Sequence, residues 1–94
     1  MGILATRWEA EFEGHRIVVN RNEIGRGFAI EWDGQEIARR TWSLVGLGEL
    51  HGSAEADGKP VDVKVVIYWG GFSEMDGKCR ITVGDTEVPV RHVY

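Results

Sequence analysis

Glycine-containing turn signals divide this 94-residue chain into short segments. They occur as Glu-Gly at 13–14, Asp-Gly at 33–34, 57–58 and 76–77, and Gly-Asp at 84–85. Asp-Gly favours tight hairpin turns because both residues tolerate a positive φ, and turns at this density leave little room for a helix. The segments between them alternate apolar with polar residues, a period of two that is typical of strands with one buried face. The sequence therefore predicts an all-β protein.

The chain is short enough to limit its architecture. Ninety-four residues leave no room for a second core, so we expect a single domain over residues 1–94. Its eight strand-like segments predict an antiparallel β-sandwich of seven to eight strands, although a small barrel has the same sequence pattern. Pro89 cannot donate a ladder hydrogen bond, so the last segment, Thr86 to Val93, is expected to be an edge strand there.

Side-chain parity predicts which residues face the core. Ile37 has odd parity whereas Trp42 has even parity, which predicts a β-bulge or bend between about Ala38 and Thr41. The residues expected to face inward are Trp8, Phe12, Ile17, Val19, Phe28, Ile30, Trp32, Trp42, Leu44, Val61, Val63, Val65, Ile67, Trp69, Cys79, Ile81, Val83 and Val88.

Composition and charge exclude several classes of partner. The net charge is −4, and the only local basic pair is Arg39-Arg40, which argues against nucleic acid because phosphate binding relies on clustered Lys and Arg. Cys79 is the sole cysteine, so no internal disulfide can form and nothing suggests an oxidising compartment. The amino terminus carries no long apolar run, so no membrane contact is expected. We expect a cytoplasmic protein.

No motif in the chain carries a defined chemistry. Cys79 shares its parity with Ile81 and Val83, which predicts a buried, inert thiol rather than a nucleophile. Glu49 and His51 lie two residues apart on one strand face and could offer two metal ligands, but a zinc site needs further ligands converging on them. We therefore expect no catalysis, no metal and no cofactor.

Four tryptophans invite a carbohydrate-binding interpretation, in which indole rings stack on sugars. Trp8, Trp32 and Trp69 fall on expected inward faces, and Trp42 shares its parity with Leu44, so core packing is the favoured interpretation. A small-ligand or carbohydrate-binding β-sandwich stays the alternative function. It depends on whether Trp42 or Trp69 is exposed to solvent.

Val66, Tyr68 and Phe72 are apolar side chains without an expected interior. Contiguous exposed apolar surface usually marks an interface, so these three residues are the candidate interface. Loop cover from residues 21–27 or 70–78 is one way to bury them. The other is a weak homodimer, because two-fold contacts are the commonest oligomeric arrangement.

The segment Trp32-Asp-Gly-Gln-Glu-Ile-Ala-Arg-Arg-Thr-Trp-Ser-Leu-Val-Gly46 resembles the Fas apoptotic inhibitory molecule family. The ending Cys79-Arg-Ile-Thr-Val-Gly-Asp-Thr-Glu-Val-Pro89 looks like the closing strands of the same family's other half. Animal members contain two tandem β-sandwich domains, and this chain is similar to one of them. The resemblance implies an antiparallel β-sandwich without known catalytic residues. Family members oppose death-receptor signalling and protect cells from aggregated protein through protein–protein contacts. The sequence therefore predicts a non-catalytic protein-interaction or stability module with an unidentified protein partner.

Overall fold

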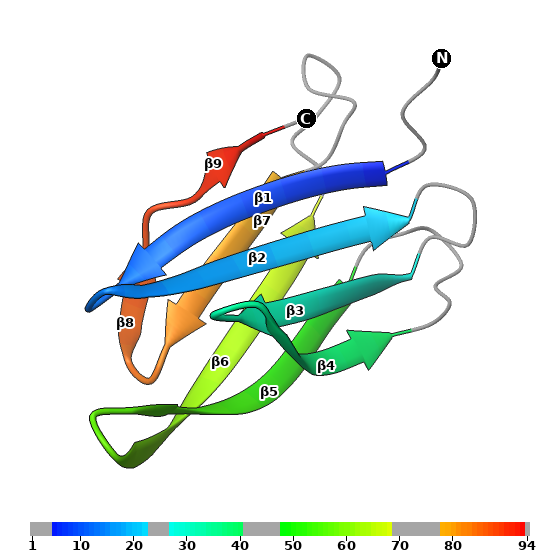
Figure 1. Cartoon of the computed structure of the whole chain (residues 1–94). Coiled ribbons are helices and arrows are strands. Elements are labelled where there is room, and N and C mark those ends of the chain that lie inside the picture. The colour runs from blue at the N-terminus through cyan, green and yellow to red at the C-terminus, as the bar shows by residue number, and fades with distance from the viewer. Residues whose placement is uncertain (1–4, 23–26, 41–47, 69–77, 94) are drawn as a thin grey trace.

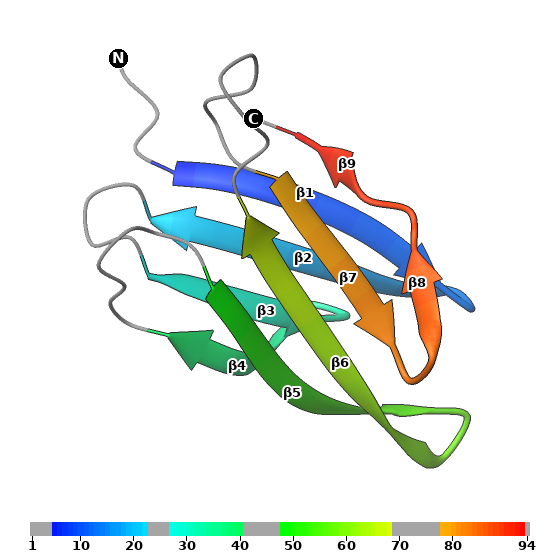
Figure 2. The ribbon, with the colours of Figure 1, turned by 180° about the vertical axis from the view of Figure 1, so that it is seen from behind.

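The computed structural model describes residues 5–22, 27–40, 48–68 and 78–93, and every regular element in these ranges is a β-strand (Figure 1). The strands are β1 (Ala5–Phe12), β2 (His15–Asn22), β3 (Phe28–Trp32), β4 (Gln35–Arg40), β5 (Gly48–Ala56), β6 (Lys59–Tyr68), β7 (Lys78–Val83), β8 (Thr86–Val88) and β9 (Arg91–His92). They form two antiparallel sheets, ordered β4-β3-β2-β1-β9 and β5-β6-β7-β8. The sheets lie face to face with their strands crossing obliquely (Figure 2). This arrangement confirms the predicted all-β sandwich.

Two-residue turns close the hairpins where the turn signals stand. Asp33 and Gly34 have φ angles of 49° and 85°, a region that aspartate and glycine tolerate better than other residues. The Asp33 amide donates to the Arg16 carbonyl at 2.8 Å, and Asp33 Oδ1 accepts from the Arg16 amide at 2.8 Å. The β3–β4 turn is thereby fastened to the start of β2. The signal at 76–77 lies outside the described residues.

The core lies between the two sheets and matches the predicted inward faces. Isoleucine and valine side chains at its centre are almost fully inaccessible: Ile17, Val19, Ile30, Val63, Val65, Ile67, Ile81 and Val83. Trp8, Phe28, Trp32 and Val88 are also buried, whereas Phe12, Val61 and Cys79 pack against the margin of the core. Ala10, Ala54 and Ala56 belong to the core as well, although they were not among the residues expected to face inward. Trp42, Leu44 and Trp69 lie outside the described residues.

The predicted bulge occurs in β4, just before the expected interval. Ile30 pairs with Ala38 and Glu31 pairs with Glu36, so Ile37 is the extra residue. At a bulge two consecutive side chains lie on the same face of the sheet, whereas a regular strand sends them to opposite faces. Ile37 and Ala38 accordingly both pack against the core.

The last predicted strand is divided between the two sheets. β8 pairs with β7, and after Pro89 and Val90 the chain crosses to pair β9 with β1. Extending the β1–β9 register would place Pro89 opposite Glu11, where the missing N–H ends the ladder. Both β8 and β9 are edge strands, as expected, and with this division the described ranges contain nine strands rather than seven or eight.

Arg21 was expected in a polar loop over residues 21–27 but belongs to β2. It is only 9% exposed, and its guanidinium carbon lies 5.8 Å from the centre of the Trp8 ring. Cation–π contact of this kind lets an arginine face a core margin. Within the described ranges no helix is long and apolar enough to cross a membrane.

Candidate interaction surfaces

The outer face of the β5-β6-β7-β8 sheet carries the residues that the sequence singled out as an interface. Val66 alternates with the core residues Val65 and Ile67 and therefore points away from the core, where it is half-buried. The register places Glu49 of β5 on one side of Val66 and Arg80 of β7 on the other. Acidic, apolar and basic side chains thus form one row across three strands.

Tyr68 lies on the same face at the end of β6 and is 37% exposed. The guanidinium carbon of Arg80 lies 5.6 Å from the centre of its ring, and Arg80 Nε lies 3.6 Å from Glu87 Oε2. The outward side chains of Glu49, Val66, Tyr68 and Arg80 are called the Tyr68 face below. The predicted pair Val66 and Tyr68 therefore share one outward surface, whereas Phe72 lies outside the described residues.

Glu49 and Arg80 were not predicted as members of this surface. Their place beside Val66 depends on the pairing of β5 and β7 with β6, which parity along one strand does not reveal. Their charge was the signal that the sequence offered.

Glu49 and His51 form the close pair that the sequence suggested as two metal ligands. Glu49 Oε1 and His51 Nε2 lie 2.5 Å apart, and this hydrogen bond holds the pKa of the Glu49 carboxyl below its usual range. Among the residues that the structure describes, no group of three or more His, Cys, Asp or Glu side chains gathers in one place. Glu49 and His51 thus form a hydrogen-bonded pair on the surface of β5.

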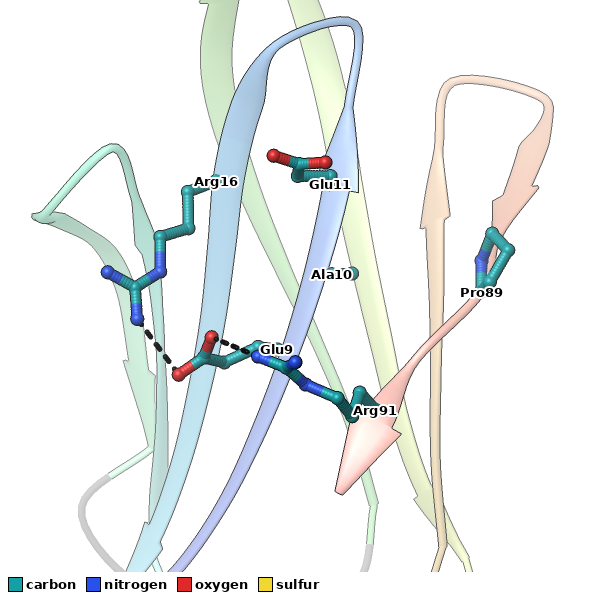
Figure 3. A pocket seen from close by; sticks show the side chains of 6 residues that line it. All are labelled: Glu9, Ala10, Glu11, Arg16, Pro89 and Arg91. Atoms are coloured by element: carbon teal, nitrogen blue, oxygen red, sulfur yellow. Dashed lines mark hydrogen bonds and ion pairs between the residues drawn. The ribbon is translucent and has the colours of Figure 1, made fainter. Parts of the chain in front are cut away.

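A hollow of about 370 Å³ opens at the β1–β9 edge of the other sheet (Figure 3). Glu9 lies at its centre between two arginines: Arg16 Nη2 donates to Oε2 at 2.9 Å, and Arg91 Nη2 donates to Oε1 at 3.2 Å. Arg7 Nε donates to the same Oε2 at 3.0 Å. The hydrogen bond from Arg16, and then that from Arg7, lowers the pKa of the Glu9 carboxyl. This cluster, with Glu11 and Pro89 beside it, is called the Glu9 hollow.

The Glu9 hollow is lined by two guanidinium groups, those of Arg16 and Arg91, and by two carboxylates, those of Glu9 and Glu11. Arg16 and Arg91 each use one nitrogen on Glu9, and their side chains are 57% and 76% exposed. The remaining N–H groups of two guanidiniums from different strands therefore face solvent across one hollow. Sequence reasoning missed this cluster because Glu9 and Arg91 are 82 residues apart.

A second hollow, of about 410 Å³, lies where β4 meets β5 and is bounded by Trp32, Ile37 and Pro60 among others. Trp32 is only 7% exposed and Trp8 only 3%. Neither indole presents a face on which a sugar ring could stack. The two tryptophans on which the carbohydrate interpretation depends, Trp42 and Trp69, lie outside the described residues.

Cys79 packs against the margin of the core and is partly buried. Burial raises the pKa of its thiol to about 12, so little thiolate exists near neutral pH. This agrees with the predicted inert thiol.

Comparisons of the chain with known protein families, curated proteins and solved structures found no match. The likeness to the Fas apoptotic inhibitory molecule family accordingly stays an expectation from the sequence.

Proposed function

We propose that this protein is a non-catalytic interaction module that binds other proteins through the Tyr68 face. One observation carries the proposal: Tyr68 is exposed beside the half-buried Val66, with the guanidinium of Arg80 placed over its ring. Tyrosine and arginine are enriched at protein–protein interfaces and dominate their binding energy. An aromatic ring, an aliphatic side chain and a guanidinium on one sheet face fit that composition.

The energetics favour a partner at this position. Completing the burial of an aliphatic side chain such as Val66 contributes up to about 1.5–3 kcal/mol. The guanidinium of Arg80 already lies over the Tyr68 ring, and any ordering of side chains before binding lowers the conformational entropy that binding must remove. The resemblance to one domain of the Fas apoptotic inhibitory molecule family, whose members act through protein–protein contacts, supports the same proposal.

Affinity capture from a lysate of the native cells tests the proposal when it compares three purified baits. These are the wild-type chain, the Val66→Ser/Tyr68→Ser double variant, and an Arg39→Gln control on the other sheet, where the exposed Arg39 pairs with Glu36. We expect the wild type and the control to capture partner proteins that the double variant does not capture. Such a partner, once purified, should bind the wild-type chain directly. Equal capture by all three folded baits would contradict the assignment of this face.

A second candidate function, binding of a small anionic ligand, is favoured by the Glu9 hollow. Phosphate and carboxylate groups accept paired hydrogen bonds from guanidinium N–H groups, and Arg16 and Arg91 both direct such groups into the hollow. Titration of the protein with inorganic phosphate, with amide chemical shifts as the readout, tests this role. Saturable shifts near Arg16 and Arg91 that an Arg91→Gln variant loses would support it, whereas unsaturated or scattered shifts would reject it.

A further inference from the structure

We propose that one protein partner of the Tyr68 face is a second copy of this chain, related by a two-fold axis that lies in the interface and runs along β6. The inference rests on the proposed function and names the partner of that same surface. It depends on the way charge is distributed about β6.

The charge on the Tyr68 face is opposite on its two flanks. Glu49 of β5 and Arg80 of β7 are the direct cross-strand neighbours of Val66, so a carboxylate and a guanidinium lie on either side of an apolar centre. The hydrogen bond from His51 lowers the pKa of Glu49, which keeps that carboxylate ionised near neutral pH. The row is therefore negative on one side of β6 and positive on the other.

A two-fold rotation about an axis along β6 exchanges these flanks. It sets Glu49 of one copy over Arg80 of the other, and the same rotation sets Arg80 over the second Glu49. An axis across the strands would instead bring Glu49 over Glu49 and Arg80 over Arg80, which like charges disfavour. An isologous interface needs such self-complementarity, because each contact between two unlike residues occurs twice. The charges thus select one of the two ways in which the faces can align.

The apolar residues then occupy the centre of the contact. Val66 and Tyr68 both belong to β6 and lie next to the axis, where each meets its own counterpart in the second copy. Charged pairs surround this centre, as in the polar rim of a typical interface. Lys64 lies two residues before Val66 on the same face of β6, so its two copies also lie near the axis, where their long side chains can direct the ammonium groups out to solvent. The contact covers only part of one sheet face, so we expect a weak dimer.

Two charge-reversal variants provide the decisive test, because mixing them cannot act through contacts within one chain. In Glu49→Arg both flanks of the row are basic, and in Arg80→Glu both flanks are acidic. Each variant alone then sets like charges against each other, whereas a mixed pair has opposite charges at both contacts. Sedimentation equilibrium of the wild type, each variant and their equimolar mixture measures the association.

We expect each variant alone to dimerise at least about tenfold more weakly than the wild type, and their mixture to form a heterodimer at least about tenfold tighter than either variant's own dimer. Association of the mixture no stronger than that of the single variants would overturn the inference, as would a wild-type chain that is monomeric up to about 0.5 mM. Loss of lysate partners from the Val66→Ser/Tyr68→Ser bait together with a monomeric wild type would leave the interaction function standing while rejecting the second copy as its partner. A wild-type dimer that the same double substitution leaves intact would place the contact elsewhere and reject the second copy as the partner of this face, whereas equal lysate capture by all three baits would reject the interaction function.

Discussion

Gly52 of β5 lies so close to Ile37 of β4 that a Cβ atom at position 52 would be 3.0 Å from Ile37 Cδ1 and 3.2 Å from Ala38 Cβ. The β4 bulge produces this contact, because it turns Ile37 and Ala38 toward the core together. Absence of a side chain at position 52 lets the edges of the two sheets approach on this side of the sandwich.

Replacing Gly52 by valine should destabilise the fold by about 1–3 kcal/mol, the usual cost of forcing extra methyl groups into a packed site. Removing the opposing side chain should relieve the clash, so we expect a smaller cost for Gly52→Val in an Ile37→Ala background. Urea denaturation of the four chains measures both effects. The exposed neighbour Ser53 provides a control, since Ser53→Val should change stability by no more than about 0.5 kcal/mol. Equal costs at positions 52 and 53 would contradict the packing described.

Glu9 should contribute stability that depends on pH. Its pKa is lowered in the folded chain, mainly by Arg16, so the unfolded chain takes up the proton first as the pH falls. The contribution is therefore complete above the ordinary glutamate value of 4.5 and is lost as the pH falls through the lower folded value. We expect Glu9→Gln to unfold at lower urea concentration than the wild type at about pH 7, and the difference to shrink as the pH falls below 4.5.

Glu11 is the matched control for that measurement. It lies on the same strand and face as Glu9, and within the described ranges no hydrogen bond or ion pair engages it. Glu11→Gln should leave the urea midpoint and its pH profile close to those of the wild type. A difference between Glu9→Gln and the wild type that stays constant down to about pH 3 would contradict the ionic role of Glu9.

Cys79 should resist alkylation in the folded protein. A rise in its pKa from 9.0 to about 12 reduces the thiolate at neutral pH by roughly a thousandfold, and the thiolate is the reactive form. We expect iodoacetamide to modify Cys79 at least about a hundredfold more slowly in the native chain than in urea, because local opening exposes a fraction of the buried thiol. Mass spectrometry measures the rate of modification in both states. Native and unfolded rates within about tenfold of each other would show that the thiol is accessible in the folded chain.

Much of this fold could be predicted from local sequence signals. Strands such as β6 alternate valine and isoleucine with polar residues, and a period of two assigns one face to the core without knowledge of the neighbours. Asp33-Gly34 marks its turn because few other pairs adopt positive φ at both positions. These signals depend only on residues close in sequence.

Features that depend on the pairing between strands could not be predicted in the same way. Pro89 indicates an interrupted ladder, but the transfer of the chain from one sheet to the other depends on the free edge of β1. The change of parity after Ile37 predicts a bulge only approximately, and the extra residue proved to be Ile37 itself, just before the expected interval. Ala54 and Ala56 give no apolar signal strong enough to place them in the core.

The candidate surfaces also contain some residues that local sequence signals predict and others that depend on the pairing between strands. Val66 and Tyr68 could be predicted because they break the polar pattern of one strand face. Their neighbours Glu49 and Arg80 could not, because two cross-strand registers bring them together. The cluster around Glu9 depends on a contact between β1 and β9, at opposite ends of the chain.

Amide chemical shifts recorded during dilution of the wild-type chain, from about 0.5 mM to about 10 µM, are the most direct test of the proposed dimer, because this range spans the dissociation constants expected of a weak dimer. We expect concentration-dependent shifts centred on Glu49, Val66, Tyr68 and Arg80, four outward residues of the β5-β6-β7-β8 sheet. Shifts that do not change on dilution, or changes confined to the outer face of the β4-β3-β2-β1-β9 sheet, would contradict the proposed dimer.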